Sequence, residues 1–467
     1  MGSPAGAAIV EVKPIGTTAA GPGAVAVDAQ NRIHVTWQSA VDHQLHHTVV
    51  AGKRKTDELV DAQPESGAGS SLAIDSAGHP HVAYLVLRNQ QQRLAYAEFD
   101  GTAWHTEELG SGGAPLALAL DADDQPHIVQ QADSFEYVHR DESGWEHEVL
   151  SDMDALNGDA LSLAIDADGH AHLTANSSGP LGPLYATNAS GDWVRTTLAP
   201  DGGSEQTVAL GALALDSQGQ PHVALSAANP TTVRHRHFDG AAWQSEDLYD
   251  ANSLPPGTTD SPQAASIAIG TSDRPAIVFL DQFSQSSKRT ASFLAYAYKR
   301  GAHWLELDVA AKADFEQWTR MAAAPDGSAA VLYATKRTLE NTTQSLRVAR
   351  VGIPDLAGSW TSLTVTPKGQ ISRVTGVLEV ANLGPAKSGS PAITLYLSSD
   401  AALDGSDSVI GFRKPIGTVG VGHTRSVKIV LNPLVPVSGK YLIAVIDADD
   451  QLHDQDPANN VVPGLLN

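Results

Sequence analysis

Aspartate and histidine recur six residues apart at five places in the chain, and of all its patterns this one is most suited to chemistry. A carboxylate beside an imidazole can orient a general base, and the two groups can also ligate a metal. In two further copies both partners are replaced together, by Gly270 with Ala276 and by Ala324 with Ala330. The joint replacement indicates that the two side chains work as a pair. The five pairs are Asp28 and His34, Asp75 and His81, Asp121 and His127, Asp166 and His172, and Asp216 and His222.

Two interpretations of these pairs are open. They could be five catalytic or metal-binding dyads, or they could be hydrogen bonds that lock a turn. One active site rarely needs five equivalent copies, whereas a turn lock is useful in every copy of a repeat. Because paired titratable groups often serve structure alone, we favour the structural interpretation.

The pairs belong to a longer repeated stretch, clearest in residues 71–84, which read Ser-Leu-Ala-Ile-Asp-Ser-Ala-Gly-His-Pro-His-Val-Ala-Tyr. The spacing between copies runs from 45 residues, between Asp121 and Asp166, to 54, between Asp216 and Gly270. Such a period is typical of a β-propeller blade. The seven copies begin at residues 24, 71, 117, 162, 212, 266 and 320.

One copy of the repeat predicts four short antiparallel strands, at 72–75, 80–85, 94–99 and 104–109. These segments are apolar or alternate with period two, and Gly-containing turns separate them. The sequence therefore predicts an all-β fold whose residues 1–353 form a seven-bladed β-propeller.

Closure of this ring depends on the start of the chain. The first copy has no fourth strand before it, and the last copy has none after its third. We expect residues 8–13 to pair with 346–351 and to close the ring, which removes the exposed sheet edges.

A tryptophan opens the predicted fourth strand of five copies, and Tyr or His lies eight residues earlier. We expect these aromatic side chains to pack between neighbouring blades, with sugar stacking in a groove as the alternative. The tryptophans are Trp104, Trp145, Trp193, Trp243 and Trp304.

Long connections in the fifth to seventh copies break the regularity of the repeat, and we expect them at residues 250–265, 281–292, 310–319 and 334–345. Connections on one face of a rigid scaffold are where ligand-binding residues concentrate, although loops also drift freely. Trp318 departs from the tryptophan pattern, so we expect it to be exposed in one of these loops. The predicted ligand-binding residues are Trp318, Asp281, Arg289 and Arg337.

The composition changes after Gly352, and residues 354–467 show alternating strands with Gly, Pro and Asn turns at the spacing of a β-sandwich. The segments 377–386, 395–411 and 441–460 resemble the bacterial cell-adhesion-related (CARDB-type) immunoglobulin-like domain. That family usually has Glu where this chain has Asp454 and Asp456. The resemblance implies an immunoglobulin-like β-sandwich in a secreted or cell-surface protein of a prokaryote, and it implies no catalysis.

The repeat itself resembles secreted bacterial propellers with Ser-Leu-Ala-x-Asp-x-x-Gly-x-Pro-His-Val-x-Tyr units, a sialidase-like group. Sialidase Asp-boxes read Ser-x-Asp-x-Gly-x-x-Trp. Here only Asp100-Gly101 before Trp104 and Asp239-Gly240 before Trp243 approach that pattern. No arginine triad can be assigned, so the resemblance does not imply sialidase activity.

Two acidic clusters in the C-terminal segment have the oxygen-rich spacing of a Ca²⁺ loop, although neither matches the EF-hand. Calcium is the one cofactor that the sequence suggests, and a solvated acidic turn is the alternative. The candidate ligands are Asp400, Asp404 and Asp407, and Asp447, Asp449, Asp454 and Asp456.

The overall charge limits the kinds of partner that the chain could bind. With 30 basic and 53 acidic residues the chain carries −23 at pH 7, so nucleic acid and anionic membranes would repel it. No Cys is present, which excludes thiolate chemistry, and no apolar run is long enough to insert into a membrane. Residues 1–10 lack the pattern of a signal peptide, so secretion would need a signal that this sequence does not include.

Three functions remain open from the sequence. The first is a non-catalytic recognition or adhesion protein that binds a glycan or a surface protein through the propeller, with the sandwich as spacer or anchor. The second is a glycoside hydrolase or polysaccharide lyase, for which the non-repeat His43, His46 and His47 with Arg289 or Arg337 are conceivable groups. The third is a structural matrix protein. We favour the first.

Overall fold

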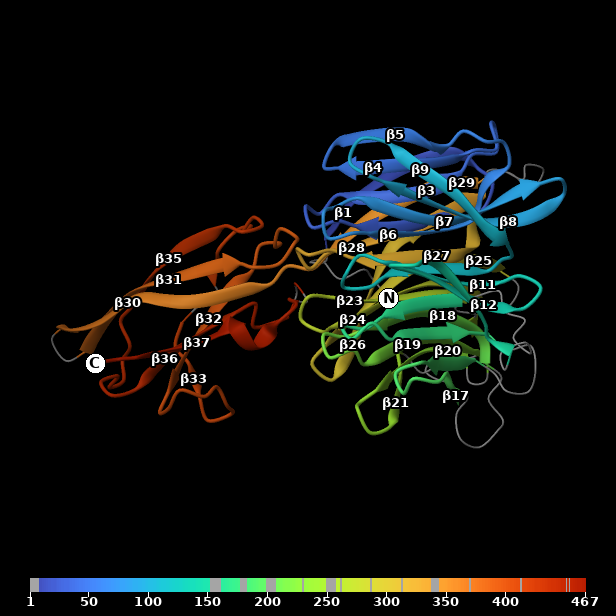
Figure 1. The fold of residues 1–467 in the computed structure, drawn as a ribbon. Helices are drawn as coiled ribbons and strands as arrows, with labels where there is room; N and C mark the ends of the chain where they lie inside the picture. Colours follow the sequence, from blue (N-terminus) through green and yellow to red (C-terminus); the bar gives the residue numbers. More distant parts are fainter. Residues whose placement is uncertain are drawn as a thin grey trace. The chain divides into compact units, whose positions relative to one another are not determined.

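The computed structural model describes two compact units, and each is described below by itself (Figure 1). The larger unit spans 11–325 and 329–350, and most of the smaller one lies in 351–467. The described residues are 8–151, 161–176, 183–198, 207–228, 231–248, 258–260, 263–285, 288–311, 314–336, 344–368, 371–411, 414–450, 452 and 454–467.

The larger unit consists of seven antiparallel sheets, which we call blades 1 to 7. Each contains four strands, except blade 6, which has five. Blades 1 to 4 are β2 (Ala24–Val27), β3 (Ile33–Gln38), β4 (Leu45–Ala51) and β5 (Arg54–Asp61); β6 (Ser66–Ile74), β7 (Pro80–Arg88), β8 (Gln91–Phe99) and β9 (Trp104–Ser111); β10 (Leu116–Leu120), β11 (Pro126–Gln131), β12 (Phe135–Asp141) and β13 (Gly144–Val149); and β14 (Leu161–Ile165), β15 (Ala171–Ala175), β16 (Leu184–Thr187) and β17 (Val194–Thr197).

The remaining blades have longer strands. Blades 5 to 7 are β18 (Thr207–Leu215), β19 (Pro221–Ala228), β20 (Thr231–Phe238) and β21 (Trp243–Asp247); β22 (Thr258–Asp260), β23 (Gln263–Ile269), β24 (Pro275–Gln285), β25 (Lys288–Arg300) and β26 (His303–Ala311); and β27 (Phe315–Ala323), β28 (Ala329–Lys336), β29 (Gln344–Gly352) and β1 (Ala8–Ala19).

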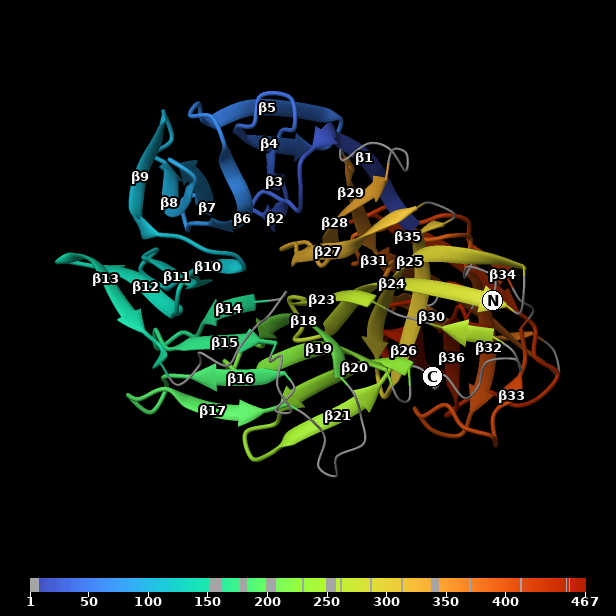
Figure 2. The same ribbon diagram turned by 90° about the vertical axis from the view of Figure 1, so that its right-hand side faces the viewer.

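The blades form a closed ring (Figure 2). The first long strand of each blade contacts its counterpart in the next, from β2 through β6, β10, β14, β18 and β23 to β27, and β27 contacts β2 again. The last blade is completed by β1, which pairs with β29. The expected closure by the start of the chain is therefore confirmed, and the larger unit is a β-propeller.

Apolar contacts between successive blades hold the ring together. One buried cluster joins Leu45 and Val60 of blade 1 to Val82 and Tyr84 of blade 2, and another joins Val129 of blade 3 to blade 4. Because side chains of a strand alternate between its two faces, each inner strand supplies apolar groups to both neighbouring interfaces. This explains why these strands are nearly continuously apolar, as in Leu116–Leu120.

Blade 6 differs from the expected architecture. Residues 281–285 and 288–292, expected to lie in a long loop, belong instead to β24 and β25, which stay paired from Ala276 with Tyr298 to Gln285 with Lys288. The sequence predicted a loop here because Gln282, Ser284 and Ser292 are polar. A strand depends on the alternation of its side chains and not on hydrophobicity alone.

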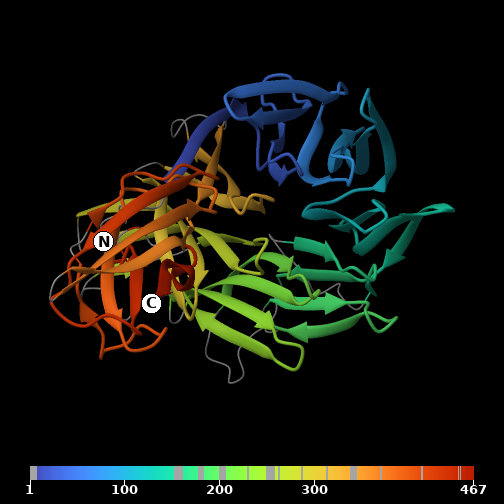
Figure 3. The same ribbon diagram turned by 90° about the vertical axis from the view of Figure 1, so that its left-hand side faces the viewer.

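The smaller unit is a two-sheet β-sandwich (Figure 3). Buried Leu378, Val427, Leu395 and Ala444, from both sheets, share one core. One sheet contains β30 (Leu356–Lys368), β31 (Ile371–Asn382) and β35 (Thr424–Leu431); the other contains β33 (Ser408–Val409), β34 (Lys414–Pro415), β32 (Ala392–Ser398), β36 (Tyr441–Ile446) and β37 (Val461–Leu465), and a single 3₁₀ turn, η3 (Pro457–Asn460), precedes β37.

Candidate functional site

Each of the five Asp–His pairs lies at the turn between the first two strands of its blade. The carboxylate Oδ2 and the imidazole Nε2 are 3.1 Å apart in blade 1 and 3.2 Å apart in blade 4. In blades 2, 3 and 5 the separations are 3.5, 3.4 and 3.6 Å. The same carboxylates accept backbone N–H groups of the turn, as Asp121 does from Asp123 and Gln125. The pairs therefore close the turn.

A third side chain extends the pair in blades 2 to 4. The Nδ1 atom of His127 lies 2.5 Å from the hydroxyl oxygen of Tyr137, and that of His172 lies 2.6 Å from Tyr185. Nδ1 of His81 also contacts the hydroxyl of Tyr96, which in addition lies 3.2 Å from Oε2 of Glu98. Because the aspartate only accepts hydrogen bonds, Nε2 carries the imidazole proton, and Nδ1 accepts from the tyrosine hydroxyl.

Burial keeps the histidine and the tyrosine of each triad neutral, so only the aspartate is charged. Burial lowers the pKa of His81, His127 and His172, against the opposing effect of the aspartate hydrogen bond. Burial also raises the pKa of the tyrosines, in Tyr185 to about 12. A neutral imidazole whose two nitrogens are both engaged has no free position for a substrate proton. These groups therefore fit a structural role and not that of a catalytic base.

The tyrosine of each triad also contacts the next blade. Tyr137 meets the edge of Trp193 at a ring separation of 5.4 Å, and Tyr96 meets Trp145 at 5.0 Å. The indole N–H of Trp193 donates to Glu148 of blade 3. The expected packing of aromatics between blades is thus confirmed, and it couples every turn lock to a blade interface.

In blade 1 a histidine occupies the place of the tyrosine, and the row of hydrogen-bonded side chains is longer than a triad. The Nδ1 atom of His34 lies 3.0 Å from Nε2 of His47, and Nδ1 of His47 lies 2.9 Å from Oε1 of Glu58. Three contacts thus link two imidazoles and two carboxylates, Asp28 and Glu58. Three contacts need three protons, but two neutral imidazoles supply only two.

Hydrogen bonds and burial set the ionisation of the groups around His47. Despite burial, hydrogen bonds hold the pKa of Asp28 below its usual value, and the bond from His47 lowers the pKa of Glu58. Burial lowers the pKa of His34 to about 4, which favours its neutral form. In blade 5 the corresponding Glu246 pairs with Lys299, and burial lowers the pKa of His235 to about 2. The hydrogen-bonded histidines of blade 5 therefore stay neutral.

His46 lies between two carboxylates at the edge of blade 1. Its Nδ1 and Nε2 atoms are 3.0 Å from Asp57 and 3.1 Å from Asp42, and its ring stacks on Trp37. The hydrogen bond to Asp57 raises the pKa of His46. Of the histidines suggested for catalysis, His46 is thus held as a cation, His47 is buried in the hydrogen-bonded row of blade 1, and exposed His43 lies 3.7 Å from Glu65.

The predicted ligand-binding set is not assembled by the described residues. Trp318 is only 9% exposed, in a cluster with Ile15 and Trp37, so its expected exposure is wrong. It lies in β27, where it fills the interface between blades 7 and 1. Asp281 is also buried, within the blade 6 hairpin. Arg337 and the side chain of Arg289 lie outside the described residues, so a ligand site there stays a prediction.

An arginine that the sequence interpretation missed is exposed on the innermost strand of blade 7. Arg320 contacts the carbonyl oxygen of its neighbour Thr319, and no carboxylate of the described residues pairs with it. The signal was available in the repeat, because the equivalent positions of all other copies hold small residues: Ala24, Ser71, Ala117, Ser162, Ala212 and Ser266.

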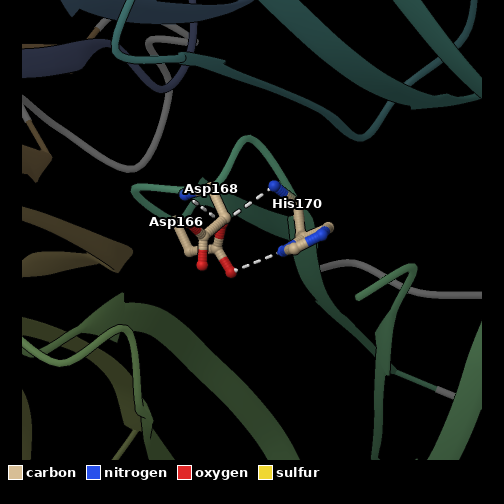
Figure 4. Close-up of side chains that lie close together, drawn as sticks. All are labelled: Asp166, Asp168 and His170. Atoms are coloured by element: carbon tan, nitrogen blue, oxygen red, sulfur yellow. Dashed lines mark hydrogen bonds and ion pairs between the residues drawn. The ribbon is translucent and has the colours of Figure 1, made fainter. Parts of the chain in front are cut away.

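One set of side chains has the composition of a metal site. Asp166, Asp168 and His170 bring one ligand atom each within 4.8 Å of one another (Figure 4). However, Oδ1 of Asp166 accepts two backbone N–H groups, and its Oδ2 lies 3.1 Å from His170 and 3.2 Å from His172. The set is thus explained by the turn lock of blade 4.

The acidic clusters of the sandwich differ from each other. Asp400, Asp404 and Asp407 are at the surface and accept hydrogen bonds from their own turn, for example from Ser406 to Asp404. Asp447 is buried and accepts from the backbone of Leu452. Burial raises the pKa of Asp454 to about 7, and Asp456 caps the 3₁₀ turn η3. A Ca²⁺ role for these residues, Asp449 included, stays a prediction.

No protein-family model and no curated protein matches this chain. Among solved structures, it is similar to a protein of unknown function from Dyadobacter fermentans, with 12% identity, 74% of this chain and 99% of that chain covered, and a TM-score of 0.44. It is also similar to the β-propeller domain of Cps50 (Swd1) from Myceliophteria thermophila, with 12% identity, 73% and 99% covered, and a TM-score of 0.43. YCF48 bound to D1 peptide matches at 12% identity, 73% and 94% covered, and a TM-score of 0.44.

The described part of the chain contains no helix long and apolar enough to cross a membrane. The class of protein defined by fold and site is a β-propeller followed by a β-sandwich, with its repeated Asp–His groups committed to structure.

Proposed function

We propose that this is a non-catalytic recognition protein of the cell surface or extracellular space, whose propeller binds a glycan or a protein and whose sandwich serves as spacer or anchor. The observation that carries the proposal is Arg320. A guanidinium exposed on the innermost strand, with no carboxylate partner among the described residues, offers a fork of donors to a ligand carboxylate or sulfate.

The buried triads support recognition over catalysis. The five paired imidazoles are buried, and both ring nitrogens are hydrogen-bonded in His34, His127 and His172, so these positions offer no exposed general base. Binding needs no such base. The ligand would carry an anionic group, because the guanidinium of Arg320 can pair with one locally.

A glycan array that includes uronic-acid and sulfated glycans tests the proposal. We expect discrete acidic hits, weakened at least about tenfold by Arg320→Ala, since a charge-assisted pair contributes about 1.5–3 kcal/mol. The matched control is Arg54→Ala, which removes an exposed arginine from the outer strand β5. Hits that tolerate Arg320→Ala, or that respond equally to both variants, would contradict the proposed site.

The enzymatic alternative has one observation in its favour, namely the imidazole of His46 between Asp42 and Asp57, whose side chains are partly exposed. Reducing-end and unsaturated-product assays on uronate polysaccharides test it. Turnover that disappears in His46→Asn would establish the enzyme, and we expect no turnover.

A further inference from the structure

Two carboxylates and two amide oxygens gather where the sandwich begins. Asp355 precedes β30, and Asp454, Asn459 and Asn460 lie in and before η3. We call these four residues the Asp454 site. Asp454 is 1% exposed and accepts the backbone N–H groups of Leu356, at 2.6 Å, and Asp456, at 3.0 Å. The site therefore ties the start of β30 to η3.

The site has an excess of negative charge and of acceptors. Asp355 and Asp454 bring two carboxylates into electrostatic contact, and no cationic side chain of the described residues forms an ion pair with either of them. Asn459 donates from Nδ2 to Oδ1 of Asp355, at 2.9 Å, but its own Oδ1 is buried and accepts nothing. Asn460 is 4% exposed, its amide contacts Asp454, and its Oδ1 is likewise buried without a partner.

Unsatisfied buried oxygens are costly, and two of them beside two carboxylates require an explanation. A backbone or hydroxyl donor does not reach them in the described structure. A hard cation would satisfy these oxygens once the two amides turn them toward the carboxylates, because carboxylate and amide oxygens are the ligands that Ca²⁺ prefers in proteins. Asp355 is only half-buried, so water could complete the coordination.

We propose that the Asp454 site binds one Ca²⁺ through Asp355, Asp454 and the side-chain oxygens of Asn459 and Asn460. The ion would fasten the first strand of the sandwich to its last turn. This assignment separates Asp454 from the surface turn of Asp404 and Asp407, which closes through its own hydrogen bonds. It is independent of the proposed ligand at Arg320.

Calcium titration of the full chain by calorimetry, after treatment with a chelator, tests the inference. We expect one site with a dissociation constant of about 1 mM or tighter, the range of extracellular calcium modules. Excess Ca²⁺ should also raise the melting temperature by mass action, and Mg²⁺ should do so less.

Two variants and a control decide the outcome. Asp454→Asn should weaken Ca²⁺ binding at least about tenfold, but it could also disturb the backbone bonds to Leu356. Asp355→Asn leaves those bonds in place and should weaken binding similarly. Asp141→Asn removes the same charge from a surface turn of the propeller, outside every candidate Ca²⁺ cluster, and should leave binding unchanged. Absence of a site near 1 mM, binding that persists in Asp355→Asn, or equal loss in Asp141→Asn would overturn the inference.

Discussion

Removing a single hydroxyl from a triad separates the structural from the catalytic interpretation of the repeated Asp–His pairs. Tyr137→Phe deletes the oxygen that donates to Nδ1 of His127, while the ring can keep its contacts with His139 and Trp193. Both Tyr137 and His127 are buried, so the imidazole nitrogen is left without a partner. Such a loss costs about 1–3 kcal/mol in the free energy of unfolding.

The repeat makes the experiment quantitative. Tyr96, Tyr137 and Tyr185 occupy the same place in blades 2, 3 and 4. Because separate sites without shared partners act nearly additively, replacing all three by Phe should cost about 3–9 kcal/mol. Guanidinium unfolding followed by tryptophan fluorescence measures the change, since each tyrosine lies against a tryptophan of the next blade.

Tyr333→Phe is the matched control. Tyr333 is 3% exposed in blade 7, and the hydroxyl has no protein partner among the described contacts, so we expect a change within about 0.5 kcal/mol. If Tyr137→Phe is as mild as this control, the triad does not stabilise the ring. If it leaves stability unchanged but abolishes an activity, the triads are catalytic and the reasoning above is wrong.

Three further predictions concern the ring. The folded state holds the pKa of His34 at about 4, below the 6.5 of an unfolded histidine. The contribution of His34 to the free energy of unfolding is therefore full above pH 6.5 and declines by up to about 3 kcal/mol as the pH falls to 4. Unfolding of the wild type and of His34→Gln, measured against pH, would show no such difference if His34 were not buried in its neutral form. Deleting residues 1–19 removes β1 and leaves the edge of β29 unpaired, so light scattering should detect association that a deletion of residues 1–7 does not cause. Gly113→Ala would place a Cβ against the carbonyl oxygen of Gln131 and should lower the free energy of unfolding by about 3 kcal/mol. The control is Gly21→Ala, whose Cβ meets no atom within 4 Å. Equal thermal stability of the two variants would refute the close approach at Gly113.

The sequence determined the elements of the ring by repetition. Asp121 and His127 mark the same turn as Asp75 and His81, and a strand with alternating side chains has only one way to bury its apolar face. The closing role of residues 8–13 also followed, because a four-stranded repeat that starts without its last strand leaves one strand to be supplied. The strands of the sandwich were predicted from their alternation and from the Gly, Pro and Asn turns between them.

Only the tertiary structure decided which side chains meet. Tyr96 precedes Trp104 by eight residues, but it packs on Trp145 of the next blade, because successive blades lie face to face. The hairpin of blade 6 was hidden by its polar residues, and burial of Trp318 depends on contacts with Ile15 and Trp37, about three hundred positions away. The acceptors of the Asp454 site lie about a hundred residues apart in sequence, since Asp355 and Asn459 are joined only by folding. Repetition fixes local structure, whereas contacts between distant segments depend on the path of the whole chain.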